Sequence, residues 1–283
     1  MTAWRVLTYQ IADPAWNMAV DEAIFIRYLE GISPPTLRFY GWSPPTLSIG
    51  YFQDLEREIK IDVIRQKGYG LVRRNTGGRA VLHDRELTYS VIAGVKEGFP
   101  DSLIESYLFI SRAFIEALRS LGVEAELNQG AAKRGTTGAC FESPSWYEIT
   151  VNGRKLIGSA QLRRQNAFLQ HGSILIRFSA ADLGAVLNLP DDSSAAYMNM
   201  LRAKICCLEE LGINLEPSEL ALKISDSFQK LYGFPFEAGD LNGAELELAN
   251  SLAKKKYAAE RWTYQRGTRH NQTSINGIQA GNG

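Results

Sequence analysis

The chain has 283 residues, of which 45% are hydrophobic and 22% are charged, so it is long enough to bury a substantial core. Its 31 basic and 31 acidic side chains cancel, which argues against a general binder of nucleic acids or membrane surfaces. The first residues lack the apolar segment of a secretory signal, no apolar run approaches the roughly 20 residues of a membrane span, and three cysteines form no disulfide framework. We therefore expect a cytoplasmic protein that binds neither nucleic acid nor membrane.

The first half of the chain alternates helical and strand-like segments. Asp13 and Pro14 are typical of a helix start, and apolar residues then recur at helical spacing up to Gly31. Two short strands joined by a proline-rich turn are expected at 36–40 and 46–50. After them the pattern predicts a short helix at about 59–67, a strand at 71–73, a half-buried strand at 87–93 and a helix at 102–121.

The second half begins with strands and ends in helices. Strand-like runs cover 146–151, 156–161 and 172–176, and Asn152-Gly153 is typical of the turn of a β-hairpin. From about residue 180 the pattern becomes helical, including 217–231 and 244–258. The adjacent Cys206 and Cys207 are expected in a helix core, and the composition after Gly267 is typical of disorder.

A glycine-arginine motif is the first candidate binding element. Paired glycines let backbone approach a ligand and expose N–H groups, and arginines supply planar, permanently charged donors. The spacing fits neither a P-loop nor a dinucleotide fingerprint, and a tight turn with solvated arginines accounts for the same residues. Its candidate residues are Arg73, Arg74, Thr76, Gly77, Gly78, Arg79 and His83.

Cys140 and Lys155 are the candidate reactive pair. Cys140 lies in a run of small residues, and Lys155 follows it by 15 positions. An ammonium group close to a thiol favours the nucleophilic thiolate, so the two would suit acyl transfer through a thioester. Taken alone, a structural cysteine and a solvated hairpin lysine are the commoner situations.

Small residues and histidines supply the remaining candidates. Gly158-Ser159-Ala160 would allow close packing against a substrate chain. His83 and His171, the latter followed by Gly172, could orient a substrate or relay a proton, although a structural histidine at a strand edge is equally compatible. No Cys-x-x-Cys or paired-histidine motif indicates a metal site.

Taken in order over residues 5–265, these motifs resemble the superfamily of lipoate-protein ligase A, octanoyltransferases and biotin ligases. Residues 73–84 are similar to its Arg-Arg-x-Ser/Thr-Gly-Gly lipoyl-binding loop, and 152–160 to its lysine-bearing loop. Residues 256–262 resemble the Lys-Tyr…Glu-Trp ending of many members. Residues 137–149, which include Cys140, are most similar to the cysteine-dependent octanoyltransferases of the LipM type.

The resemblance implies an α+β fold with a mixed, largely antiparallel central sheet flanked by helices, as in class II biotinyl and lipoyl ligases. It implies a single catalytic domain over residues 1–265, with a core at about 32–248 and a helical C-terminal end at 249–265. Residues 266–283 are expected to form a disordered tail. The protein is expected to be a monomer.

The resemblance also implies an acyltransferase of protein lipoylation. Octanoyl-acyl carrier protein would be the donor, and a lipoyl-domain protein such as glycine-cleavage H protein would be the acceptor. Cys140 would carry the octanoyl group as a thioester, Lys155 would assist it, and no ATP, metal or other cofactor would be needed. Arg73, Arg74 and Arg79 would also attract these acidic carriers.

Three alternatives stay open at the level of the sequence. An ATP-dependent lipoate-protein ligase would use Lys155 on a lipoyl-adenylate and leave Cys140 incidental. A lipoyl or octanoyl amidotransferase would take its acyl group from one lipoyl domain and pass it to another. A non-catalytic module would bind acyl carriers without forming a covalent adduct.

Overall fold

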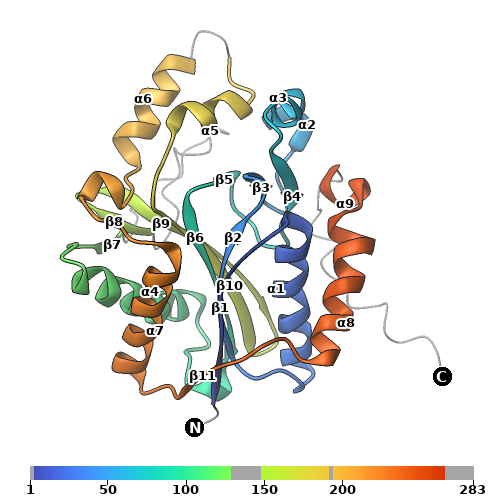
Figure 1. Ribbon diagram of the computed structural model, residues 1–283, viewed down its shortest axis with the longest axis vertical. Helices are drawn as coiled ribbons and strands as arrows, with labels where there is room; N and C mark the ends of the chain where they lie inside the picture. Colours follow the sequence, from blue (N-terminus) through green and yellow to red (C-terminus); the bar gives the residue numbers. More distant parts are fainter. Residues whose placement is uncertain (1–2, 129–147, 191–193, 265–283) are drawn as a thin grey trace.

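The computed structural model describes residues 3–128, 148–190 and 194–264 (Figure 1). Its main sheet consists of β1 (Trp4–Ala12), β2 (Thr36–Trp42), β6 (Glu86–Gly94), β7 (Glu126–Asn128), β8 (Glu148–Val151), β9 (Arg154–Arg164), β10 (Ala167–Leu175) and β11 (Phe236–Ala238). The order across the sheet is β11-β1-β2-β6-β10-β9-β8-β7. The strands β11, β1 and β2 are parallel neighbours, and the other adjacent pairs are antiparallel. The predicted mixed, largely antiparallel sheet flanked by helices is therefore confirmed.

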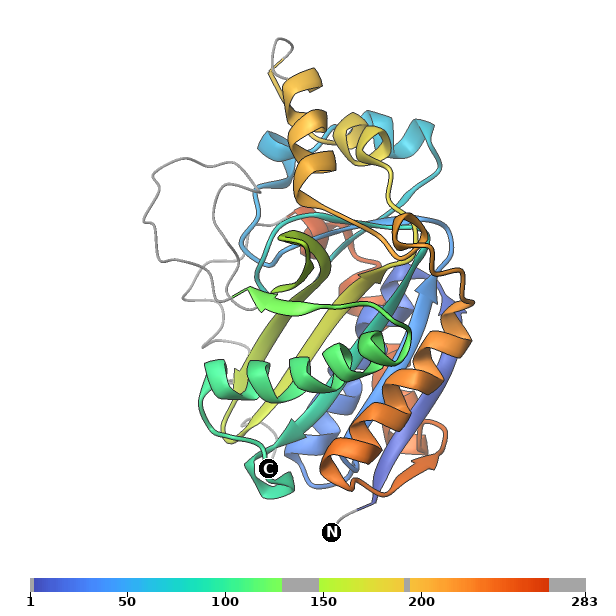
Figure 2. The same ribbon diagram turned by 90° about the vertical axis from the view of Figure 1, so that its left-hand side faces the viewer.

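Helices cover both faces of this sheet. On one face lie α4 (Leu103–Ser120) and α7 (Pro217–Tyr232), which are in front in Figure 2. On the other face lie α1 (Pro14–Leu29) and α8 (Gly243–Leu252). Tyr89 of β6 packs in the cluster of Phe114 and Ile224, whereas Ile92 of the same strand packs in the cluster of Ile24 and Ala249. The prediction of a half-buried strand at 87–93 was wrong, because apolar helices bury both of its faces.

A smaller sheet, in the order β4-β3-β5, lies at one end of the main sheet (Figure 1). It consists of β3 (Thr46–Ile49), β4 (Gly70–Arg73) and β5 (Val81–His83). Four helices surround it, namely α2 (Leu55–Glu58), α3 (Ile61–Gln66), α5 (Ala180–Val186) and α6 (Ser194–Lys204). The expected strands at 36–40 and 46–50 both exist, but they belong to different sheets, so their proline-rich connection passes from one sheet to the other.

Local signals correctly predicted several boundaries. Asp13 caps α1 by accepting a hydrogen bond from the Trp16 N–H, and Pro14 is its first residue. Asn152 and Gly153 both have positive φ angles, 51° and 72°, at the tight turn between β8 and β9. The predicted helices at 59–67, 102–121, 217–231 and 244–258 correspond to α3, α4, α7 and α8, the last continuing into a π-helical segment, η3 (Ala253–Tyr257), before α9 (Glu260–Tyr264).

Other expectations needed correction. The strands β1 and β11 gave no recognised signal in the sequence, although β1 is central to the parallel part of the sheet. Cys206 and Cys207 are buried as expected, but they follow the end of α6 rather than lying in a helix. The predicted tail at 266–283 falls outside the described residues. Within 3–128, 148–190 and 194–264, no helix combines the length and apolar character needed to cross a membrane.

Candidate active site

A cavity of about 410 Å³ brings the separate sequence motifs together. Its wall receives residues from the small sheet, from β2, β6, β7, β8, β9 and β10 of the main sheet, and from α1 and α6. The predicted site residues that line it are Arg74, Gly78, Arg79, His83, Lys155, Gly158, Ser159, Ala160, His171 and Gly172. Antiparallel pairing of β9 with β10 places Ser159 opposite Gly172 and Ala160 opposite His171, which explains why the last two motifs share one wall.

Cys140 lies outside the described residues. Thr76 and Gly77 are not among the residues that line the cavity, although Thr76 contacts one that does, His171. Arg73 does not line the cavity either, and its side chain is fully buried. Its position is set by the contacts described next.

Arg73 joins the glycine-arginine loop to the C-terminal helix. Its guanidinium donates hydrogen bonds to the carbonyl oxygens of Gly50 (3.0 Å), Gln53 (2.7 Å) and Thr263 (2.8 Å). In return, Trp262 donates from its indole N–H to the Arg73 carbonyl oxygen at 2.8 Å. The expected role in attracting acidic carriers was wrong for Arg73, because a buried guanidinium bound to carbonyl groups presents no charge at the surface.

Arg74 organises the glycine turn from inside. It is buried, and its guanidinium donates to the carbonyl and hydroxyl oxygens of Ser48 and to the carbonyl oxygens of Gly77 (3.1 Å) and Arg79 (2.7 Å). Burial lowers the pKa of Arg74 to about 10. Arg74 therefore presents no charge at the surface either. The Arg79 side chain, in contrast, is 40% exposed and pairs with Glu58 at 2.9 Å.

Two glycines allow this turn to close. Gly78 has a φ of +97°, a conformation that side chains disfavour. A Cβ atom on Gly50 would lie 2.0 Å from the Gly78 carbonyl oxygen, which is closer than any real contact. Gly78 was among the residues predicted for the site, but Gly50 was not. A glycine is needed at position 50 only because two loops approach each other closely there.

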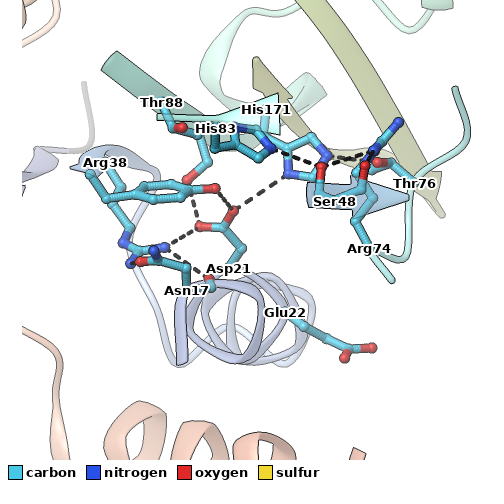
Figure 3. Close-up of polar contacts among 12 residues, drawn as sticks. Asn17, Asp21, Glu22, Arg38, Ser48, Arg74, Thr76, His83, Thr88 and His171 are labelled. Atoms are coloured by element: carbon cyan, nitrogen blue, oxygen red, sulfur yellow. Dashed lines mark hydrogen bonds and ion pairs between the residues drawn. The ribbon is translucent and has the colours of Figure 1, made fainter. Parts of the chain in front are cut away.

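His83 is held from both ring nitrogens. Its Nε2 lies 2.8 Å from Ser48 Oγ, and its Nδ1 lies 2.7 Å from Glu86 Oε1. The ring also stacks on Trp42, with centroids 4.3 Å apart. The same Glu86 oxygen accepts a hydrogen bond from Thr88 Oγ1, which in turn accepts from Trp42 Nε1 at 2.7 Å. Together these contacts, of which the one with Ser48 is drawn in Figure 3, fix one orientation of the imidazole at the cavity wall.

Asp21 is a buried anion behind the site. It projects from α1, 2% exposed, and accepts hydrogen bonds from Arg38 Nη1 (2.7 Å), Tyr40 (2.8 Å) and Ser90 (2.8 Å). Burial alone would raise the pKa of Asp21, but the Arg38 charge, the nearby His171 ring and the hydrogen bond from Arg38 outweigh it, so that the pKa lies below its usual value. Asp21 was not among the residues predicted for the site; its signal in the sequence is a carboxylate within an apolar helical run.

His171 connects Asp21 to the glycine-arginine loop. Its Nδ1 lies 3.6 Å from Asp21 Oδ2, and its Nε2 lies 2.6 Å from Thr76 Oγ1 (Figure 3). Burial lowers the pKa of His171 despite the nearby carboxylate, which favours the neutral imidazole. With Nδ1–H facing Asp21, Nε2 accepts the hydrogen bond of the Thr76 hydroxyl. Thr76 is thus tied to the cavity wall through His171.

Lys155 is the cationic group of the predicted pair, and Glu148 is its partner. Lys155 Nζ donates to Glu148 Oε1, and their side chains are 26% and 15% exposed. Both residues line the cavity. The sequence analysis did not identify Glu148, because the hairpin register that brings β8 beside β9 contains an irregularity between Ile149 and Thr150.

The two described cysteines do not line this cavity, although the Cys206 N–H donates to the Lys155 carbonyl oxygen at 2.9 Å. Neither Cys206 nor Cys207 is among the residues that line the cavity, and burial raises the pKa of the Cys206 thiol to about 11. Within the described part of the chain, no group of three or more His, Cys, Asp or Glu side chains is arranged to hold a metal ion.

Comparison with known proteins identifies the family. The sequence model of one protein family, the lipoyl protein ligase A/B catalytic domain, matches residues 13–229, which is most of the chain. The chain belongs to this family. It is 47% identical over 274 residues to octanoyltransferase LipM of Moorella thermoacetica, a match that covers 93% of this chain and 98% of that protein. It is 38% identical over 275 residues to octanoyltransferase LipM of Bacillus subtilis, with the same coverage of 93% and 98%.

Solved structures of the family agree with the fold. A bipartite lipoate protein ligase from Thermoplasma acidophilum is similar with a TM-score of 0.79 and 25% identity, over 95% of this chain and 99% of that one. A lipoate-protein ligase A bound with ATP is similar with a TM-score of 0.77 and 26% identity, over 93% and 99%. The resemblance to LipM-type octanoyltransferases is thereby confirmed, and this family member is an acyltransferase rather than a non-catalytic module.

Proposed function

We propose that the protein transfers an octanoyl group from octanoyl-acyl carrier protein to a lysine of a lipoyl-domain protein, such as glycine-cleavage H protein. The observation that carries this proposal is the position of Lys155, which lies on one cavity wall with the glycine-arginine loop and the small-residue strand. The LipM relatives support octanoyl as the group transferred. Residues 73–83, 158–160 and 171–172 contribute to the substrate site directly or, as with Arg73 and Thr76, by holding its loop.

Cys140 is the proposed nucleophile. The chain has three cysteines, and burial raises the pKa of the other two, Cys206 and Cys207, which makes them poor sources of thiolate. The Cys140 thiolate attacks the carbonyl carbon of the donor thioester, a new C–S bond forms, and the carrier leaves as its thiolate and takes up a proton. The amine of the acceptor lysine then attacks the octanoyl-cysteine, the C–S bond breaks, and the amide forms with return of the Cys140 thiol.

Lys155 is the proposed electrostatic partner of this nucleophile. A positive charge beside a thiol favours the thiolate, and the same charge stabilises the oxyanion that forms during attack. Glu148 holds the ammonium group in position in the free protein. Lys155 gives a proton to the departing carrier thiolate and, then neutral, takes the proton of the attacking amine, which must itself be uncharged, and passes it to the departing Cys140 sulfur.

The cavity accommodates the acyl chain in this proposal. Met18, Tyr40, Trp42 and Ala160 provide apolar surface in its lining. At about 0.8 kcal/mol per buried CH₂, six methylenes contribute about 5 kcal/mol of binding free energy. Binding of the chain therefore requires no charged partner, which matches a fatty acyl group.

Intact-mass analysis tests the acyl-enzyme directly. The protein is mixed with octanoyl-acyl carrier protein without ATP, denatured in acid and weighed. We expect one octanoyl group on the wild type and on Cys207→Ala, none on Cys140→Ala, and strongly reduced labelling of Lys155→Ala. An octanoyl group that persists on Cys140→Ala would overturn the proposal.

A second candidate is an ATP-dependent lipoate ligase, which the similarity to lipoate-protein ligase A bound with ATP favours. It predicts lipoate transfer that requires ATP and survives Cys140→Ala. A third, the amidotransferase, predicts acylation of Cys140 by octanoylated H protein but not by octanoyl-acyl carrier protein. Supplying each donor separately, with and without ATP, distinguishes the three.

A further inference from the structure

Glu148 is the one carboxylate among the described residues that line the cavity. The cations in the same lining are Arg74, Arg79, Lys155 and Lys204. Arg79 pairs with Glu58, which is not part of the lining, so within the described wall Glu148 alone supplies negative charge. This balance suits the thiolate and the oxyanion of acyl transfer, but it repels a lysine side chain that enters as ammonium.

The alternation of β8 directs Glu148 to the cavity. Successive residues of a strand face opposite sides of its sheet. Ile149 and Val151 pack in the hydrophobic core between the sheet and α4. Glu148 and Thr150, which alternate with them, line the cavity. The Glu148 side chain is 15% exposed, and its carboxylate accepts a hydrogen bond from Lys155 Nζ, so it is accessible to a group that enters the cavity.

A bulge turns Lys155 to the same side. The pairing of β8 with β9 contains a register shift, and a bulge of this kind redirects side chains. The consecutive residues Leu156 and Ile157 both pack in the core beside α4, which breaks the alternation of β9. Lys155 is thereby left on the cavity side, where it meets Glu148.

This ion pair changes during the proposed reaction. Once Lys155 has given its proton to the departing carrier thiolate, Glu148 has lost its counter-ion. A carboxylate without a counter-ion in a partly buried site costs free energy. The next group to enter is the acceptor lysine, which arrives as ammonium because the ordinary pKa of lysine is about 10.4. The described wall offers this cation no other carboxylate.

We propose that Glu148 binds the ammonium group of the acceptor lysine. The carboxylate takes this group as its new counter-ion beside neutral Lys155. The ammonium gives one proton to the Lys155 amine, and the freed amine attacks the carbonyl carbon of the thioester. As the C–S bond breaks, Lys155 passes this proton to the Cys140 sulfur and takes a second one from the nitrogen, whose third hydrogen stays on the amide.

The exchange restores the pair of Glu148 and charged Lys155 at the end of the reaction. It also selects the nucleophile, because an uncharged molecule such as water gains nothing from the carboxylate. The inference rests on the proposed function, since it concerns the acceptor of that reaction.

Single-turnover transfer from the octanoyl-enzyme tests this contact. The protein is octanoylated with octanoyl-acyl carrier protein, separated from the donor and mixed with increasing concentrations of glycine-cleavage H protein. Loss of the octanoyl group, followed by intact mass, gives a half-saturating concentration of acceptor and a limiting rate. A parallel series uses hydroxylamine, a nitrogen nucleophile that is uncharged at neutral pH.

Three variants are compared with the wild type. Glu148→Gln keeps the shape of the side chain and removes its charge, whereas Glu148→Asp keeps the charge. Glu210→Gln is the matched control, because Glu210 pairs with the neighbouring cation Arg154 but does not line the cavity.

We expect Glu148→Gln to take up the octanoyl group and to need about ten-fold more H protein for half-saturation, the loss typical of a hydrogen bond between charged groups. Its reaction with hydroxylamine should change little. Glu148→Asp should raise the half-saturating concentration less than Glu148→Gln does, and Glu210→Gln should leave it unchanged.

A lower limiting rate with an unchanged half-saturating concentration would show that Glu148 only positions Lys155, and would overturn the inference. Equal effects of Glu148→Asp and Glu148→Gln would also overturn it, as would a Glu148→Gln protein that takes up no octanoyl group. Each of these results leaves the proposed function intact, because the wild type still passes its octanoyl group to H protein. A wild type that does not do so overturns the proposed function and this inference together.

Discussion

Gly158 leaves the space that the end of the Lys155 side chain occupies. A Cβ atom on Gly158 would lie 2.5 Å from Lys155 Cε and 2.7 Å from Lys155 Nζ. Apart from Gly158 and its two chain neighbours, no backbone atom of the described residues lies within 4 Å of that point. A methyl group there would therefore displace the Lys155 side chain without moving the backbone. The substitution can thus change the function of this strand without changing its stability.

Gly158→Ala is expected to lower the rate of acyl transfer about 100-fold, the loss typical of a displacement of about 1 Å in a reacting group. The free energy of unfolding should change little, since the flexible lysine moves aside. Single-turnover acylation and urea unfolding measure the two effects. Gly243→Ala, where an added Cβ meets nothing within 4 Å, is the control and should leave both unchanged. A Gly158→Ala protein with the wild-type rate would show that the position of Lys155 is not critical.

Asp21→Asn is expected to reduce the free energy of unfolding by about 3–5 kcal/mol, because it leaves the buried Arg38 charge without its counter-ion. The lowered pKa means that ionised Asp21 stabilises the fold above the ordinary aspartate pKa of 3.8 and loses this effect as the pH falls through the folded pKa. The difference between wild type and variant should thus shrink in acid. Denaturant unfolding at several pH values measures it, and Asp62→Asn, in an exposed pair, is the control. A difference that does not vary with pH would contradict this assignment.

His171 is expected to stay neutral at pH 6.5. Burial lowers its pKa in the folded state, so the unfolded chain binds a proton more readily below the ordinary histidine pKa of 6.5. Protonation therefore costs stability as the pH falls from 6.5 toward the folded pKa, and His171→Gln should remove that part of the acid sensitivity. Nitrogen chemical shifts of the imidazole report its charge directly. A shift typical of imidazolium at pH 6.5 would exclude the proposed hydrogen bond from Thr76 to Nε2.

The pair of Arg5 and Glu245 is expected to anchor α8 to β1. Both terminal guanidinium nitrogens of Arg5 lie 2.6 Å from Glu245 oxygens, and the two side chains are 9% and 0% exposed. Glu245→Gln should lower the free energy of unfolding by about 3–5 kcal/mol, because Arg5 then remains buried without a counter-ion. Glu209→Gln, which breaks the exposed pair with Arg177, should have a much smaller effect. Equal losses in thermal unfolding would show that burial does not determine the strength of these pairs.

Much of the secondary structure was predictable because its signals are local. Asp13 and Pro14 specify a helix start through the backbone groups of the next turn, and Asn152-Gly153 specifies a hairpin through positive φ angles. The strand β1 has no such signal. It pairs with β2, more than 20 residues away, and with β11, more than 200 residues away, so no window of sequence contains its partners.

The site was predictable in its chemistry but only partly in its geometry. The sequence indicated a glycine-arginine loop, a lysine and two histidines, and most of these residues line one cavity. It could not distinguish Arg73, which bonds buried carbonyl groups, from Arg74, which reaches the cavity. The role of Cys140 stays a prediction.

By itself, then, the sequence determined the local elements and the set of reactive groups, because capping, turn formation and charge depend on a residue and its near neighbours. Only the tertiary structure decided which groups meet. The contacts of Asp21 with His171, of Glu148 with Lys155, and of Gly50 with Gly78 each arise where strands or loops distant in sequence pack together. Such contacts depend on closing long loops and on strand register, and neither is encoded within a short segment.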